Sequence, residues 1–147
     1  MLILVIILHA VLVNVDDHCF NNKRSHSKYE TISVITNAIL FLIPQVMAIF
    51  FTYSEEMGLA YKIIAGLSML SIVQSETFHQ NLELKERLVH ACLYILHPIV
   101  LFTFFESWQN NYFEVHPNFW MIQLMYVGVG FKTISYQIIY WNYIHDK

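Results

Sequence analysis

The sequence is poor in charge. Only 13% of its 147 residues are Asp, Glu, Lys or Arg, against about 25% in a typical soluble domain. It has 4 glycines and 3 prolines, too few for a flexible linker or a loop-rich all-β fold. Its two cysteines, Cys19 and Cys92, form no CxxC pair, so we expect no disulfide framework. With no basic block and a formal net charge of −3, we expect no nucleic-acid partner.

Hydrophobic residues make up 56% of the chain and gather in five long runs. A bilayer core about 30 Å thick requires roughly 20 apolar residues in a helix, and a spanning segment must satisfy its own backbone hydrogen bonds. The sequence therefore predicts an all-α fold, a polytopic membrane helical bundle of about five transmembrane helices. The single integral membrane domain covers residues 1–147, with spans at about 1–15, 32–53, 57–79, 88–105 and 119–140.

The first run differs from a signal peptide, because it lacks a basic segment at its start and a small-residue cleavage site after it. We therefore expect residues 1–15 to be a retained span. The stretch that follows, residues 16–31, reads DDHCFNNKRSHSKYET. It is polar and has no apolar period, which predicts a loop on the membrane surface.

The basic residues predict the orientation of the chain. Five spans place the polar stretch 16–31, the connection near residues 80–87 and the C-terminal tail on one side. Those segments contain the basic residues Lys23, Arg24, Lys28, Lys85, Arg87 and Lys147. Because basic loops stay in the cytoplasm, we expect the N-terminus outside and the C-terminus in the cytoplasm, in a bacterial inner membrane or an organelle membrane.

Ionisable residues are concentrated between the third and fourth runs, in the sequence SETFHQNLELKERLVH from Ser75 to His90. If these two spans form a hairpin, equal distances from its turn mean equal depth, which brings Glu76, His79 and His90 together. Imidazoles and carboxylates that project from facing helices are typical metal ligands, so these three residues are candidates for a transition-metal site. The alternative is a solvated turn, where charged residues are ordinary.

Two further histidines, His9 and His97, lie near the middle of the first and fourth spans. A histidine at mid-membrane depth is rare and suggests function. A haem with two axial histidines requires them on different helices at matched depth, which this pair meets approximately. The alternative is a pair of neutral imidazoles that hydrogen-bond neighbouring helices.

Lys132 is the one base well inside the fifth run. Its stem is long enough to extend to the membrane surface, which is the ordinary arrangement. The alternative is an ion pair with Glu76 in the same half of the bilayer. Nearby, Gly128 and Gly130 favour a close approach of another helix.

Three classes of function are compatible with these features. The first is a metal- or haem-binding membrane protein. The second is a non-catalytic accessory subunit of a larger membrane complex. The third is a proton- or ion-coupled carrier that uses Glu76, His90 and Lys132 as a relay. No nucleotide loop, nucleophile elbow or HExxH motif points to an enzyme class. The expected surroundings are the lipid bilayer, with further copies or other subunits as neighbours.

Overall fold

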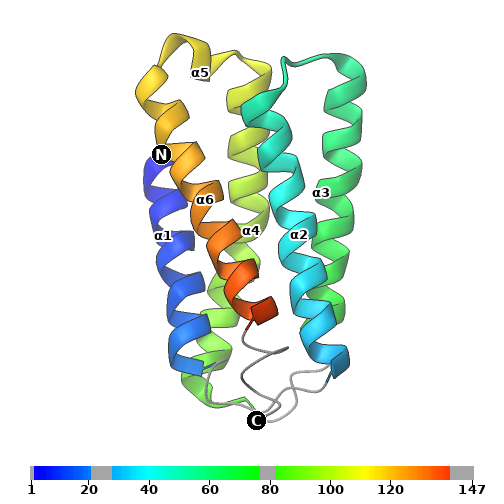
Figure 1. The fold of residues 1–147 in the computed structure, drawn as a ribbon, viewed down its shortest axis with the longest axis vertical. Helices are drawn as coiled ribbons and strands as arrows, with labels where there is room; N and C mark the ends of the chain where they lie inside the picture. The colour runs from blue at the N-terminus through cyan, green and yellow to red at the C-terminus, as the bar shows by residue number, and fades with distance from the viewer. Residues whose placement is uncertain (1, 21–27, 77–81, 140–147) are drawn as a thin grey trace.

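The computed structural model describes residues 2–20, 28–76 and 82–139, and every element in these ranges is a helix. The all-α prediction is confirmed. The elements, in chain order, are α1 (Leu2–Val15), a π-helix η1 (Asp16–Phe20), α2 (Lys28–Phe50), α3 (Glu55–Glu76), α4 (Leu84–Gln109), the short α5 (Tyr112–Val115) and α6 (Pro117–Ile139). The long helices run side by side as one bundle, with α5 capping its upper end (Figure 1).

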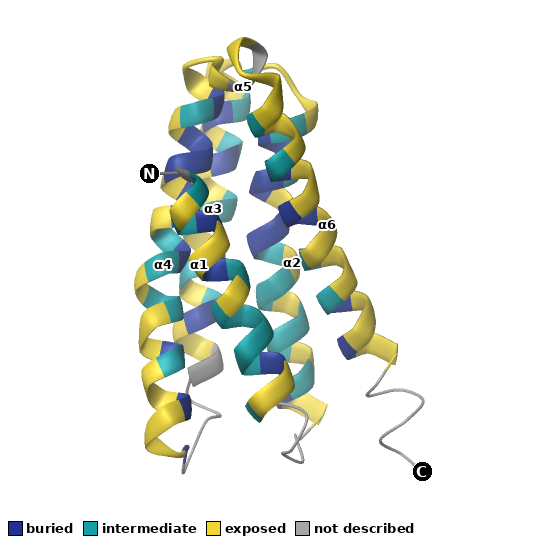
Figure 2. Cartoon of the chain, turned by 90° about the vertical axis from the view of Figure 1, so that its left-hand side faces the viewer, coloured by how far each residue is buried: buried dark blue, intermediate teal, exposed yellow. Residues whose placement is uncertain are grey.

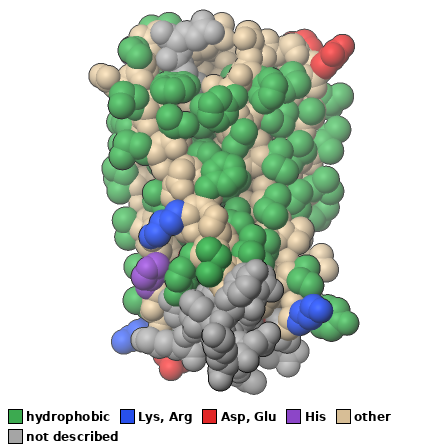
Figure 3. All heavy atoms as spheres, in the orientation of Figure 1, with side chains coloured by type: hydrophobic (Ala, Val, Ile, Leu, Met, Phe, Trp, Pro, Cys, Tyr) green, Lys and Arg blue, Asp and Glu red, His purple; other side chains and the backbone are tan. Residues whose placement is uncertain are grey.

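Four of the described helical segments are long and apolar enough to cross a membrane. These segments are Ile3–Phe20, Lys28–Phe50, Glu55–Gln74 and Leu84–Gln109. Helix α6 is 23 residues long but carries Gln123, Lys132 and Gln137, and it is not among the four. On the face shown in Figure 3, hydrophobic side chains cover much of the surface. Exposed apolar surface of this extent suits contact with lipid rather than water, so the bundle has the features of an integral membrane protein.

The long helices pack both on helices adjacent in the chain and on helices distant in it. Helix α3 packs mainly on α2, whereas α4 packs mainly on α1 and α6 lies against α2. Helices α3 and α4 also contact each other, and the hairpin assumed for the predicted metal site stays a prediction.

The best-packed part of the core lies in the upper half of the bundle, as the distribution of buried residues in Figure 2 shows. Val100 and Phe104 of α4 are completely buried there. The Tyr61 hydroxyl of α3 donates to the Leu101 carbonyl at 2.7 Å, which ties α3 to α4. The Trp108 indole donates to the Phe51 carbonyl at 2.6 Å, which ties α4 to the segment after α2.

The prediction of a surface loop over residues 16–31 is wrong at both of its ends, which are helical. Residues 16–20 form η1, which continues α1, and α2 already begins at Lys28. Both Asp17 and Glu30 are buried. The prediction failed because hydropathy treats each polar residue as solvated, whereas side chains of neighbouring helices can bury and pair it.

The two central glycines of α6 differ in their surroundings. A Cβ on Gly130 would lie 2.6 Å from Leu42 Cδ2 of α2, whereas a Cβ on Gly128 would meet nothing within 4 Å. We expect Gly130→Ala to lower the free energy of unfolding by about 1 kcal/mol, the low end for overpacking, because the Leu42 side chain can turn aside. Gly128→Ala is the matched control and should leave stability unchanged or slightly higher. Equal unfolding midpoints of the two variants in detergent would contradict the close α2–α6 contact.

Candidate functional site

A cavity of about 170 Å³ lies in the space between α1, α2, α4 and α6. A single water needs only about 10–15 Å³ of such volume, so the cavity has room for several waters or one small molecule. It is lined by side chains from all four helices and from η1: His9, Ala10, Val13, Asp16, Asp17, Val34, Asn37, Ala38, Phe41, Leu42, Leu93, His97, Tyr126, Val129, Gly130, Thr133, Ile134 and Gln137.

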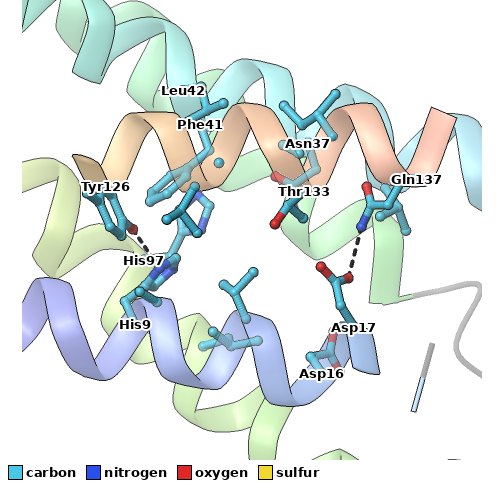
Figure 4. Close-up of a pocket in the computed structure, with 18 residues that line it drawn as sticks. His9, Asp16, Asp17, Asn37, Phe41, Leu42, His97, Tyr126, Thr133 and Gln137 are labelled. Atoms are coloured by element: carbon cyan, nitrogen blue, oxygen red, sulfur yellow. Dashed lines mark hydrogen bonds between the residues drawn. The ribbon is translucent and has the colours of Figure 1, made fainter. Parts of the chain in front are cut away.

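One end of the cavity is formed by the two histidines predicted to share a depth, His9 of α1 and His97 of α4 (Figure 4). Their ring centroids are 5.9 Å apart with an interplanar angle of 61°. His9 Nδ1 shares a hydrogen bond of 2.6 Å with the Tyr126 hydroxyl of α6. His97 Nε2 shares one of 2.9 Å with the Ser68 hydroxyl of α3. The two imidazoles thus connect four different helices.

A haem does not fit between these two histidines. The Phe41 ring contacts both imidazoles, with centroid distances of 3.9 Å to His97 and 5.0 Å to His9. The cavity is also smaller than the 300–1,000 Å³ usual for sites of drug-sized ligands, and a haem is larger still. One nitrogen of each ring is already hydrogen-bonded. The geometry resembles the alternative that we stated for this pair, imidazoles that join neighbouring helices.

The other end of the cavity is acidic (Figure 4). Asp16 Oδ1 lies 3.1 Å from Nε2 of His90 on α4. The next residue, Asp17, accepts a hydrogen bond of 3.0 Å from the Gln137 amide of α6. These consecutive acids lie in the π-helix η1, and π-helical turns occur frequently at functional sites. The wider turn allows two adjacent carboxylates to reach two different helices.

Two amide oxygens near this acidic end have no hydrogen-bond partner within the described part of the chain. They are Gln137 Oε1 and Asn37 Oδ1, and both residues line the cavity. The Gln137 side chain is only 9% exposed. Its orientation follows from the network, because its Nε2 must face Asp17 to donate, which leaves Oε1 as an unpaired acceptor. Buried polar groups are nearly always paired, so these two atoms point to a ligand or ordered water.

The predicted metal site remains untested. His79 and the side chain of Glu76 lie outside the described residues. The third predicted ligand, His90, is buried and hydrogen-bonds Asp16. Among the residues that the structure describes, no three His, Cys, Asp or Glu side chains are grouped to hold a metal ion.

Lys132 is exposed on α6, as expected for a lysine whose stem extends along a helix toward the surface. The alternative for Lys132, an ion pair with Glu76, involves a side chain outside the described residues and stays untested. The sequence pattern did not reveal the contacts of Asp16 and Asp17, because they begin a polar stretch typical of a loop. The available signal was their position directly after an apolar run.

Comparison of the chain with protein-family models, curated proteins and solved structures finds no match in any of the three. The class of protein therefore follows from the fold and the cavity alone: a helical bundle whose described residues include four helices able to cross a membrane, with ionisable side chains around a cavity between helices.

Proposed function

We propose that this chain is an integral membrane protein of the carrier class, in which the cavity between α1, α2, α4 and α6 couples the movement of a solute or ion to protons. One observation carries the proposal: titratable side chains from α1, η1 and α4 lie at both ends of one cavity. Ionisable residues inside a membrane bundle are expensive and typically mark ion pathways and proton relays.

The two ends of the cavity supply different steps of such a relay. At the acidic end, Asp16 and His90 are within hydrogen-bond distance, so a proton can be held between a carboxylate and an imidazole. At the other end, His9 and His97 lie side by side. An imidazole can accept a proton on one nitrogen and release one from the other, which suits transfer along a chain. The space between the ends is large enough for bridging waters.

The distribution of basic residues supports an orientation for this carrier. Lys28 begins α2, and Lys85 and Arg87 lie at the start of α4; both helices begin at the end of the bundle where η1 lies (Figure 1). The acids Glu55 and Glu56 lie at the opposite end, where α3 begins. By the positive-inside rule, the acidic end of the cavity faces the cytoplasm and the N-terminus lies outside.

Proton flux into liposomes tests the coupling role. Purified protein is reconstituted with a pH-sensitive dye inside, and a potassium diffusion potential is imposed with valinomycin. We expect proton uptake several-fold faster than in protein-free liposomes. His97→Gln should reduce the protein-dependent flux at least tenfold, because glutamine keeps a hydrogen bond to Ser68 but does not titrate. Asp16→Asn should do the same at the acidic end.

Glu56→Gln is the matched control, because Glu56 is exposed in the first turn of α3, at the opposite end of the bundle from η1. Its flux should equal that of the wild type. If the wild-type protein transports no more protons than empty liposomes, the coupling role fails and an accessory subunit becomes the better explanation. If His97→Gln and Asp16→Asn keep full flux, the protons do not pass through this cavity.

A further inference from the structure

Two amide side chains that line the cavity have oxygen atoms without a partner. Gln137 Oε1 of α6 and Asn37 Oδ1 of α2 are buried and accept no hydrogen bond within the described part of the chain. The orientation of the Gln137 amide is fixed, because its Nε2 donates to Asp17 and Oε1 is the acceptor that remains. Gln137 is only 9% exposed. A buried acceptor without a partner costs free energy, so this end of the cavity favours a molecule that donates hydrogen bonds.

The two unpaired amides lie at nearly the same depth in the bundle. Helices α2 and α6 run in opposite directions (Figure 1), and Leu42 of α2 lies against Gly130 of α6. Asn37 precedes Leu42 by five residues, and Gln137 follows Gly130 by seven. At a rise of about 1.5 Å per residue, Asn37 and Gln137 differ in depth by about 3 Å, which one small head group can span. Figure 4 shows both at the end of the cavity where Asp17 lies.

A hydroxyl group accompanies the two amides. Thr133 lines the same cavity and precedes Gln137 by four residues, which places both on one face of α6. A threonine hydroxyl can donate a hydrogen bond as well as accept one. A primary amide matches these groups, because it has two N–H donors for the two oxygens and a carbonyl that accepts from the hydroxyl. An alcohol has one donor and would leave one of the two oxygens unpaired.

The walls of the cavity limit the rest of such a molecule. Much of the remaining lining is aliphatic: Val13, Val34, Ala38, Val129 and Ile134. Aliphatic walls offer no hydrogen bonds but gain from contact with an apolar body. The volume of about 170 Å³ is close to that of an engineered cavity of about 150 Å³ that accepts benzene. The cavity therefore has room for an apolar body about the size of a benzene ring.

We propose that the cavity binds a small primary amide whose apolar part is no larger than a benzene ring. The two N–H groups of the ligand donate to Gln137 Oε1 and Asn37 Oδ1, and its carbonyl accepts from the Thr133 hydroxyl. The apolar part extends along the aliphatic walls toward Phe41. This inference rests on the proposed function, because it names the class of solute that the same cavity would bind.

Isothermal titration of the full-length protein in detergent micelles tests this assignment. The probe is benzamide, compared with acetophenone, which keeps the ring and the carbonyl but has a methyl group in place of the amide nitrogen. Both molecules are uncharged, so the comparison measures hydrogen bonding and not charge. We expect benzamide to bind at least about tenfold more tightly, because its two N–H donors meet acceptors that acetophenone leaves unpaired. Equal affinities would overturn the proposal. So would an absence of saturable benzamide binding, which would leave ordered water as the partner of the two oxygens.

Two variants locate the binding site. Gln137→Leu and Asn37→Leu each remove one acceptor, and each should weaken benzamide binding about fivefold or more, the effect of one lost hydrogen bond, without changing the affinity for acetophenone. They lie on different helices, so if one variant does not fold, the other still tests the site. The matched control is Asn118→Leu, which removes an exposed amide near the start of α6, outside the cavity lining, and should leave benzamide binding unchanged. An unchanged affinity for benzamide in Gln137→Leu or Asn37→Leu, with wild-type helix content, would overturn the proposal.

The binding test and the flux test fail independently. Binding of benzamide without protein-dependent proton flux would support the ligand and remove the coupling role. Proton flux through the cavity without benzamide binding would keep the coupling role and overturn the ligand class.

Discussion

Phe104→Ala is expected to lower the free energy of unfolding by about 3–5 kcal/mol, the usual range for removing a buried phenylalanine side chain. Phe104 lies in the middle of the well-packed half of α4 and is 0% exposed. Its ring packs beside that of Tyr126 on α6, with centroids 5.9 Å apart. Alanine would leave a cavity that the surrounding helices cannot close, because the neighbouring side chains are themselves held by hydrogen bonds and packing.

Phe102 is the matched control for this prediction. It lies two residues away on the same helix but is 62% exposed on the outer surface. Phe102→Ala removes the same atoms from a position that faces lipid, so we expect a change of well under 1 kcal/mol, as for surface substitutions generally. The measurement is the unfolding midpoint of each variant in mixed micelles with increasing denaturing detergent. If the two variants lost similar stability, α4 would not turn Phe104 toward the core and Phe102 away from it.

Gln123→Met is expected to act in the opposite direction and to stabilise the protein by about 2 kcal/mol or more. Gln123 is 0% exposed, and neither its Oε1 nor its Nε2 has a hydrogen-bond partner within the described part of the chain. Each buried polar atom without a partner lowers the free energy of unfolding by about 1–3 kcal/mol, and Gln123 has two such atoms. Methionine has a similar length and shape and no group that requires a partner.

The control for the stabilising variant is Asn118→Met near the start of the same helix, where the amide is exposed and the replacement should change stability little. Both variants are compared with the wild type by unfolding midpoint and by helix content. A loss of stability in Gln123→Met would mean that the Gln123 amide has a bound water or ligand as its partner. The protein would then hold a second polar site on α6, above the cavity.

The large buried aromatic residues and the buried polar residues lie in different parts of the bundle. The upper half contains most of the large buried aromatic residues, whereas the cavity and its hydrogen-bonded acids and histidines lie between α1, α2, α4 and α6. Proteins often tolerate strained or incompletely paired groups where function requires them. We therefore expect substitutions at Asp17 or His97 to change function more than stability, the reverse of substitutions at Phe104.

Much of the fold follows from local properties of the sequence. Each apolar run predicted a helix, and each described run is one, because a helix satisfies its own backbone wherever about 20 apolar residues follow one another. The depth match of His9 and His97 was also predictable, since depth follows from residue count along a straight helix, and the structure places these two rings 5.9 Å apart.

Tertiary structure alone decided the neighbours of each helix and, through them, the site. Residue counts give depth but no rotation or neighbour order, so they could not show that α4 packs on α1 or that His90 pairs with Asp16 of η1. Nor could they show that Phe41 lies against both histidines and leaves no room for a haem. Apolar length determines that a segment becomes a helix, whereas the partners of its polar side chains depend on packing between helices distant in sequence.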